Sequence, residues 1–186
     1  GFDVVIVETV GVGQSEIEIS DMVDTFLLLL SPGGGDELQG IKRGIVEVAD
    51  LVVVNKADGG LFEQAKVMAG EYAAALRLIR PLNKSWAPKV LTCSSLKNDG
   101  ISEVWKAVVE YREAVGNSGE LNRKRGAQAL HWMWNEINEN LISALRGEPK
   151  VAALINSLEN EVSKGQVAPS AAAQSVVEAF SHVNRR

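Results

Sequence analysis

Apolar residues occur along this chain in two patterns, short continuous runs and longer stretches with helical spacing. The short runs predict strands buried on both faces, because parallel strands covered by helices on each side are apolar throughout. They lie at residues 3–7, 25–30, 51–54 and 89–93. Helices are expected between and after them, at residues 15–24, from near residue 36, at 60–79 and at 101–116. This alternation predicts an α/β fold with a mostly parallel sheet.

The pattern changes in the last third of the chain. No strand pattern follows Gly119, and the spacing predicts three further helices at residues 120–146, 151–164 and 170–183. The stretch Gly116-Asn-Ser-Gly119 is typical of a boundary between domains. We therefore predict an α/β domain of residues 1–117 and an all-α extension of residues 118–186.

The first helix of the extension carries an apolar stripe. The stripe consists of Leu130, Met133, Trp134, Ile137, Leu141 and Leu145. Trp132 lies roughly 200° around the helix from Trp134. Large aromatics on two sides favour a helix that buries two faces, one of them against a second copy of the chain. A homodimer is therefore expected, and the alternative is a single exposed tryptophan.

Composition narrows the possible classes of protein. With 186 residues and 46% hydrophobic content the chain is able to bury a core. The net charge of −5 argues against a general nucleic-acid binder, and the apolar run Phe26–Leu30 is too short to span a membrane. Arg123-Lys124-Arg125 is a local basic cluster, which we interpret as a solvated helix face.

Cysteine and histidine are scarce. A single cysteine provides no disulfide framework, which fits a reducing compartment, and we expect Cys93 to be a buried small apolar residue. The two histidines, His131 and His182, are far apart and have no cysteine companions, which argues against a dedicated metal cluster.

A carboxylate and two glycines follow the first predicted strand. Residues 3–7 lead directly into Glu8-Thr-Val-Gly11-Val-Gly13. Ligands bind beyond the carboxyl ends of parallel strands, where glycine admits a phosphate close to the backbone and a carboxylate holds Mg²⁺ directly or through water. This motif alone is equally consistent with a strand followed by an ordinary turn.

The strand at 51–54 runs into a more specific motif, Asn55-Lys56-Ala57-Asp58. This is the N-K-x-D signature of GTP-binding proteins. A carboxylate at Asp58 is able to accept the N1–H and 2-amino hydrogens of guanine. Adenine presents neither group in that arrangement and would leave the acid unpaired.

A third motif follows the strand at 89–93. Ser94-Ser95-Leu96 resembles the S-A-x loop of GTPases, whose backbone N–H groups meet the guanine O6. The order of strand, N-K-x-D, helix, strand, serine loop and helix is that of the second half of a GTPase domain.

Two longer segments identify a narrower family. The segments Glu8–Glu16 and Gly34–Gly44, read as ETVGVGQSE and GGDELQGIKRG, together resemble the G proteins that chaperone methylmalonyl-CoA mutase. This family contains the bacterial MeaB-type, or ArgK-type, proteins and the mitochondrial methylmalonic aciduria type A protein. The resemblance extends over the whole chain.

The resemblance implies a P-loop NTPase-type fold, GTP or GDP and Mg²⁺ as ligands, and a homodimer. It implies that Glu8 holds Mg²⁺ and that the Gly11 N–H senses the γ-phosphate. It also implies that Asn55 supports the loop and the base edge, and that the stem of Lys56 lies along the face of the base. GTP hydrolysis would be coupled to loading or protecting adenosylcobalamin, a cofactor that the partner mutase carries.

Residues 34–44 correspond in this family to an extra switch that contacts the mutase. Asp36 and Lys42 thereby become candidates for coupling the mutase to hydrolysis. The helix dipole is a sufficient structural reason for an acid at Asp36. Lys42 is a candidate to place a charge near the transferring phosphoryl group.

One departure from the family pattern is large. No G-x-x-x-x-G-K-[ST] phosphate loop occurs in the sequence, which starts without methionine on a predicted core strand. We expect the phosphate loop upstream in a longer protein, and we expect this chain alone to be inactive. The compartment would be the cytoplasm in a bacterium or the mitochondrial matrix in a eukaryote.

Two alternatives remain at this point. A sister class of GTPases delivers metals, but those proteins carry Cys and His clusters that this sequence lacks. The second alternative is a non-catalytic interaction module that uses the glycine-rich segment and the helical extension.

Overall fold

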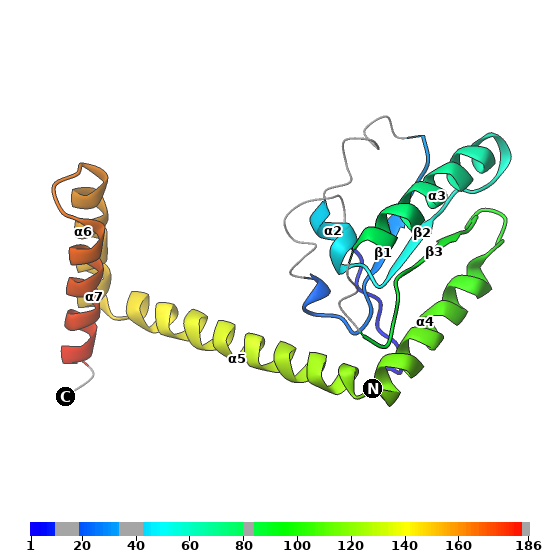
Figure 1. Cartoon of the computed structure of the whole chain (residues 1–186). Helices are drawn as coiled ribbons and strands as arrows, with labels where there is room; N and C mark the ends of the chain where they lie inside the picture. The colour runs from blue at the N-terminus through cyan, green and yellow to red at the C-terminus, as the bar shows by residue number, and fades with distance from the viewer. Residues whose placement is uncertain (10–18, 34–42, 80–83, 184–186) are drawn as a thin grey trace. The chain divides into compact units, whose positions relative to one another are not determined.

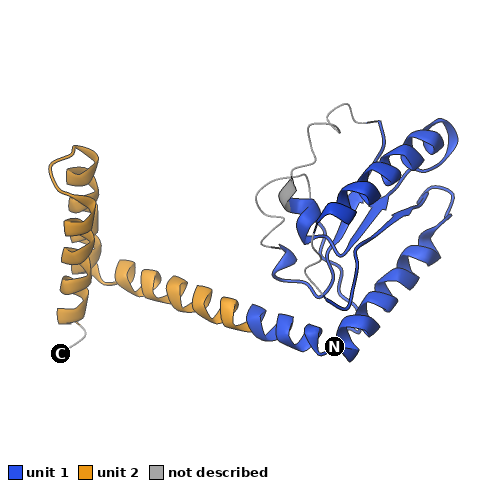
Figure 2. Ribbon diagram, viewed as in Figure 1, with its two compact units in different colours: residues 1–128 blue, residues 129–186 orange. Residues whose placement is uncertain are grey.

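The computed structural model describes residues 1–9, 19–33, 43–79 and 84–183. The chain forms two compact units, residues 1–128 and residues 129–186 (Figure 2). The boundary between the units falls inside one long helix, whereas the predicted division at residues 117 and 118 coincides with a break between two helices. The division into functional domains stays a prediction.

The first unit contains a parallel sheet of three strands, β1 (Leu27–Leu30), β2 (Leu51–Val54) and β3 (Lys89–Thr92), in the order β1-β2-β3 (Figure 1). In register, Leu27 pairs with Leu51 and Leu51 pairs with Lys89. All four residues of β2 are buried, because β2 is central and both of its faces are covered. The three strands confirm the predicted parallel sheet.

One face of the sheet packs on α2 (Arg43–Val48) and α3 (Phe62–Leu78), which follows the short 3₁₀ helix η1 (Gly59–Leu61). Val52 and Val54 point to this face. Their helical partners are Ile45, Val46, Ala65, Met68, Tyr72 and Leu76. Each fully buried valine or leucine contributes about 1.5–3 kcal/mol of hydrophobic free energy, so this cluster is a major source of stability.

The other face packs on α4 (Ile101–Asn117), which contributes Ala107, Tyr111 and Val115 to a cluster around Leu51. Trp86 completes the cluster. Its ring meets that of Tyr111 edge to face at 5.4 Å, and its indole N–H donates to the Asp50 carbonyl at 2.9 Å. The two clusters lie on opposite faces because successive residues of β2 alternate in direction.

The prediction of a buried strand at residues 3–7 is wrong for this structure. Residues 1–9 contain no strand and are exposed, with Ile6 at 84%. The apolar pattern is that of a buried parallel strand, but among the described residues this segment pairs with neither edge strand of the sheet, β1 or β3. A strand needs a partner for its backbone N–H and C=O groups, and without one the apolar side chains of this segment stay exposed.

The basic cluster Arg123-Lys124-Arg125 is a solvated helix face only in part, because Arg123 and Arg125 are exposed but Lys124 is half-buried, and two of the three residues bind Asp24. Arg125 forms a double hydrogen bond with the Asp24 carboxylate, at 2.8 Å from Nε and 2.5 Å from Nη2. Lys124 donates to the Asp24 carbonyl at 2.9 Å. These contacts could not be predicted from sequence, because Asp24 lies about 100 residues away along the chain.

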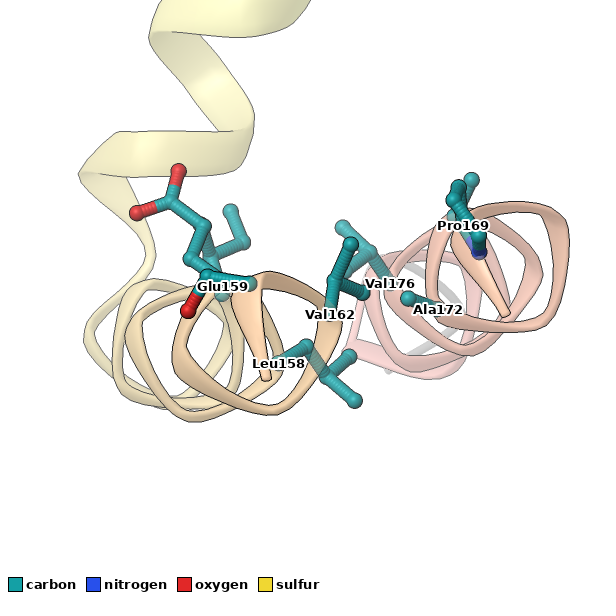
Figure 3. A pocket seen from close by; sticks show the side chains of 9 residues that line it. Leu158, Glu159, Val162, Pro169, Ala172 and Val176 are labelled. Carbon is teal, nitrogen blue, oxygen red and sulfur yellow. The ribbon is translucent and has the colours of Figure 1, made fainter. Parts of the chain in front are cut away.

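Helix α5 (Glu120–Gly147) has no fully buried residue, and the apolar stripe centred on Trp134 is largely exposed. It is followed by α6 (Pro149–Ser163) and α7 (Pro169–Val183). An open apolar hollow of about 330 Å³ lies between α6 and α7, as Figure 3 shows, with Leu158, Val162, Ala172 and Val176 in its lining. Of the helices described, none is long and apolar enough to cross a membrane.

Gly100 fixes the connection from the loop after β3 into α4. Its backbone is left-handed, with φ of 72°, and a Cβ there would lie 2.6 Å from the Thr92 carbonyl oxygen. We predict that Gly100→Ala lowers the free energy of unfolding by at least about 1–2 kcal/mol, from the left-handed backbone alone. Urea denaturation measures this change.

The matched control is Gly116→Ala near the end of the same helix, where a Cβ would meet nothing within 4 Å. This substitution should leave stability unchanged or raise it by about 0.5–1 kcal/mol. Equal stability changes in the two variants would contradict the assignment of Gly100.

Candidate nucleotide-binding site

The predicted base-reading motifs lie side by side at the carboxyl ends of β2 and β3. The chain leaves β2 at Asn55, and it leaves β3 at Cys93. The Ala57 N–H donates to the Cys93 carbonyl at 2.9 Å, and the Cys93 N–H donates to the Val54 carbonyl at the same distance. The parallel ladder therefore continues for one residue past the strands and joins the two loops.

Asn55 is the hub between these loops. Its side-chain oxygen accepts the backbone N–H of Ser95 at 3.0 Å, the Ser95 hydroxyl at 3.0 Å and the N–H of Lys56 at 2.8 Å. The Cys93 thiol approaches the same oxygen at 3.6 Å. An amide whose oxygen holds both loops fixes their separation. The role of Asn55 at the base edge, which the N-K-x-D resemblance implies, stays a prediction.

Asp58 is held by the neighbouring loop. The Ser94 hydroxyl donates a short hydrogen bond to Asp58 Oδ2, and the Lys97 N–H donates to the Ser94 hydroxyl oxygen at 3.1 Å. Ser94 is buried, whereas Asp58 is half-buried. A buried hydroxyl with two partners restricts the rotamer of the carboxylate while leaving that group in reach of a ligand.

The serine loop is closed by its own backbone. Ser94 and Asp99 exchange two backbone hydrogen bonds, at 2.8 and 3.1 Å. Leu96, between them, is 87% exposed. An exposed leucine at the tip of a rigid loop offers an apolar contact for a flat ligand.

Lys56 has a left-handed backbone with φ of 59°, unusual for a residue with a side chain. Its side chain is exposed. This conformation turns the chain sharply after β2, so that Asn55 and Asp58 both reach the neighbouring loop. The exposed aliphatic stem of Lys56 is available to lie along a base.

Cys93 is buried, as the sequence predicted, and burial raises the pKa of its thiol. A raised pKa keeps the thiol protonated at neutral pH, so the residue acts as a small apolar group with a weak donor. A role as a reactive nucleophile is not favoured.

The structure brings together the residues predicted to read guanine, namely Asn55, Lys56, Asp58, Ser94, Ser95 and Leu96. Sequence reasoning assigned Ser94 only a backbone role and missed its side-chain bond to Asp58. The sequence did contain a signal for this bond, because Ser94 directly follows the strand next to β2, whose motif ends in the acid Asp58.

The phosphate and coupling residues are less fully described. Glu8 lies in the exposed segment before residue 10, and Gly11, Asp36 and Lys42 lie outside the described residues. Within the described ranges, no three His, Cys, Asp or Glu residues form a group able to hold a metal. Mg²⁺ at a nucleotide takes one or two carboxylates together with phosphate oxygens and water, so a single exposed carboxylate at Glu8 fits its requirements.

Comparison with known proteins places this chain in a family. The family model for the methylmalonyl Co-A mutase-associated GTPase MeaB matches residues 1–150. A methylmalonic aciduria type A homolog, mitochondrial, of Caenorhabditis elegans is 46% identical over 180 residues, which are 97% of this chain and 45% of that protein. A putative GTPase of Caulobacter vibrioides is 47% identical over 180 residues, covering 97% of this chain and 55% of the relative.

The fold has a solved counterpart. A crystal structure of an LAO/AO transport system kinase superposes with a TM-score of 0.75 and 36% sequence identity, over 97% of this chain and 58% of that one. This likeness confirms the predicted α/β fold of P-loop NTPase type. The chain spans about half the length of the curated relatives it matches. The predicted family is likewise confirmed, and the chain belongs to the MeaB family of methylmalonyl Co-A mutase-associated GTPases.

Proposed function

We propose that the full-length protein binds and hydrolyses GTP, and that this chain supplies the guanine-reading half of the site. The observation that carries the proposal is the Ser94–Asp58 hydrogen bond, which fixes a carboxylate beyond the end of β2. Guanine presents two donors to such a carboxylate on one edge. Adenine would leave the acid without those donors, and an unpaired acid in a closed site is costly.

The base would be held on its edge and its faces. Asp58 accepts from the N1–H and 2-amino groups, and the backbone N–H groups of the Ser94–Leu96 loop donate to O6. The Lys56 stem and Leu96 supply apolar contact, which both exposed side chains are free to make. Asn55 keeps the two loops at a fixed separation, so the site is formed before the nucleotide arrives.

The phosphates are proposed to bind next to the segment that contains Glu8 and Gly11. Glu8 is the carboxylate proposed to hold Mg²⁺ through water, and Mg²⁺ would neutralise charge on the phosphate oxygens. The Gly11 N–H is proposed to sense the γ-phosphate. This chain alone is proposed not to hydrolyse GTP, because its sequence contains no G-x-x-x-x-G-K-[ST] loop to hold the phosphates.

The client is proposed to be methylmalonyl-CoA mutase, whose name the matching family model contains. In this proposal GTP hydrolysis is coupled to loading or protection of adenosylcobalamin in the mutase. Asp36 and Lys42 are proposed to carry the coupling, Lys42 by placing a positive charge near the γ-phosphate.

The protein is also proposed to form a homodimer through α5. The exposed residues of its stripe include Leu130, Met133, Trp134 and Leu141, and Trp134 is 58% exposed. Large apolar groups on one face of a helix favour burial against a partner. A second copy satisfies this requirement with two-fold symmetry.

The assignment of Asp58 predicts a change of base preference. In the full-length protein, Asp58→Asn should weaken GTP binding by about 10- to 100-fold, because a charged hydrogen-bond acceptor is lost. It should also favour a xanthine nucleotide, which has a carbonyl where guanine has its amine. Calorimetric titration with GTP and XTP measures both effects.

The control is Asp99→Asn, which changes an exposed acid of the neighbouring loop and should alter neither affinity. An unaltered preference for GTP in Asp58→Asn would refute the assignment.

The proposed coupling role of Lys42 predicts an effect on mutase-stimulated GTP turnover that is separate from nucleotide affinity. Methylmalonyl-CoA mutase should accelerate GTP turnover by the full-length protein, and Lys42→Ala should reduce the stimulated rate about 10-fold or more while leaving GDP affinity nearly unchanged. Single-turnover assays with and without the mutase measure this. Lys66→Ala, which removes an exposed lysine from α3, is the control. A parallel loss of GDP affinity would contradict the coupling role, and turnover indifferent to the mutase would remove the proposed client.

The proposed dimer surface is tested on α5. Trp134→Glu should shift the full-length protein from dimer to monomer in sedimentation velocity, because it places a charge in the apolar stripe. Ser143→Glu adds the same charge about 180° around the helix, on the side that carries Trp132, and should leave intact a dimer that forms through the stripe. Dissociation by both variants, or by neither, would argue against the stripe as the interface.

A further inference from the structure

Side chains of α4 and α5 hold the segment that enters β1. The Lys124 ammonium donates to the Asp24 carbonyl at 2.9 Å, and the Tyr111 hydroxyl donates to the same oxygen at 3.2 Å. The Gln128 amide donates to the Val23 carbonyl at 3.0 Å. Two adjacent backbone carbonyls are thus satisfied by three side chains rather than by a helix or strand, so rotamer changes are able to release them.

The Asp24 side chain adds a directional contact. The Arg125 guanidinium binds both carboxylate oxygens, and this hydrogen bond holds the pKa of Asp24 below its usual value. Asp24 and Arg125 are 44% and 56% exposed, so the pair contributes little to overall stability. Two parallel hydrogen bonds in one plane instead fix the orientation of this segment relative to residues 120–128, the first turns of α5.

Lys124 also reaches the start of β2. Its ammonium lies 3.9 Å from the carboxylate of buried Asp50, which accepts the Phe26 N–H at 2.9 Å. One lysine of α5 therefore contacts the residues that enter both β1 and β2. These contacts lie at the amino ends of the strands, opposite the end where Asn55 and Asp58 form the base site.

The same segment is continuous with the predicted phosphate-sensing loop. Residues 19–24 follow the stretch containing Glu8 and Gly11, and Ile19 and Val23 are packed against the core cluster beside β1. Residues 19–24 therefore pack on the core through Ile19 and Val23 and are bound by α5 through Val23 and Asp24. A movement of the predicted phosphate-sensing loop would reach α5 through these residues. The first turns of α5 thus contact the element that follows the phosphate sensor.

We propose that Lys124, Arg125 and Gln128 are positioning residues of the nucleotide switch, which couple the phosphate state to α5 through residues 19–24. This inference rests on the proposed GTPase function. In one nucleotide state the carbonyls of Val23 and Asp24 and the Asp24 carboxylate are held by α5, and in the other the hold is weakened. Because coupling free energies are reciprocal, a partner that stabilises the start of α5 shifts the relative affinity for GTP and GDP.

Hydrogen–deuterium exchange on the full-length protein tests the proposal, after calorimetry has established binding of GDP and of a non-hydrolysable GTP analogue. Amides of residues 120–128 should exchange at rates that differ about fivefold or more between the two complexes. Arg125→Gln should abolish this difference while both nucleotides still bind, and Arg125→Lys should restore part of it. Arg123→Gln is the control, because Arg123 is exposed and contacts only Glu120, 3.9 Å away, among the ion pairs of the described residues.

The outcomes separate the inference from the function on which it rests. Equal exchange in the two complexes of a protein that binds both nucleotides would overturn the coupling and leave the GTPase proposal intact. A difference that survives Arg125→Gln, or that is lost equally in Arg123→Gln, would overturn the role of these residues. Failure to bind either nucleotide in calorimetry would overturn both proposals.

Discussion

The pairing of β2 with a parallel neighbour on each edge is the constraint on which the candidate site depends. Its four residues are buried, so the strand has no freedom to slide without exposing apolar side chains or breaking two ladders. The ladder continues from Val54 to the Cys93 N–H, which fixes where both loops begin. The core therefore sets where the loops of Asn55 and Asp58 begin, and the polar contacts between the loops fix their separation and the rotamer of the Asp58 carboxylate.

Much of this organisation was predictable from sequence. The three strands and most helices follow from local apolar runs and helical spacing, and the base site follows from polar residues placed directly after two of those strands. The segment at residues 3–7 has the same pattern but forms no strand, because a strand also needs a neighbour, which composition does not reveal. The hydrogen bonds between Asp24 and Arg125 were not predicted, because a cluster of charged residues in a sequence does not indicate which distant residue it contacts.

The described part of the molecule has polar clusters at both ends of the sheet. At the carboxyl ends, Ser94 and Asn55 hold a carboxylate and two loops, the group of residues that we propose reads guanine. At the amino ends, Lys124 joins Asp24 and Asp50, so the entries to β1 and β2 are held by α5. A rigid three-stranded core between two such clusters is suited to a switch, because a change at one end moves whole elements rather than single side chains.

The most direct test of the account is the nucleotide preference of the full-length protein, measured by calorimetric titration with GDP and ADP at equal concentration of Mg²⁺. A site organised around the Asp58 carboxylate should bind GDP at least about 100-fold more tightly than ADP, because adenine leaves that acid without its donors. Comparable affinities for the two nucleotides would contradict the central claim that Asp58 and the Ser94–Leu96 loop read guanine.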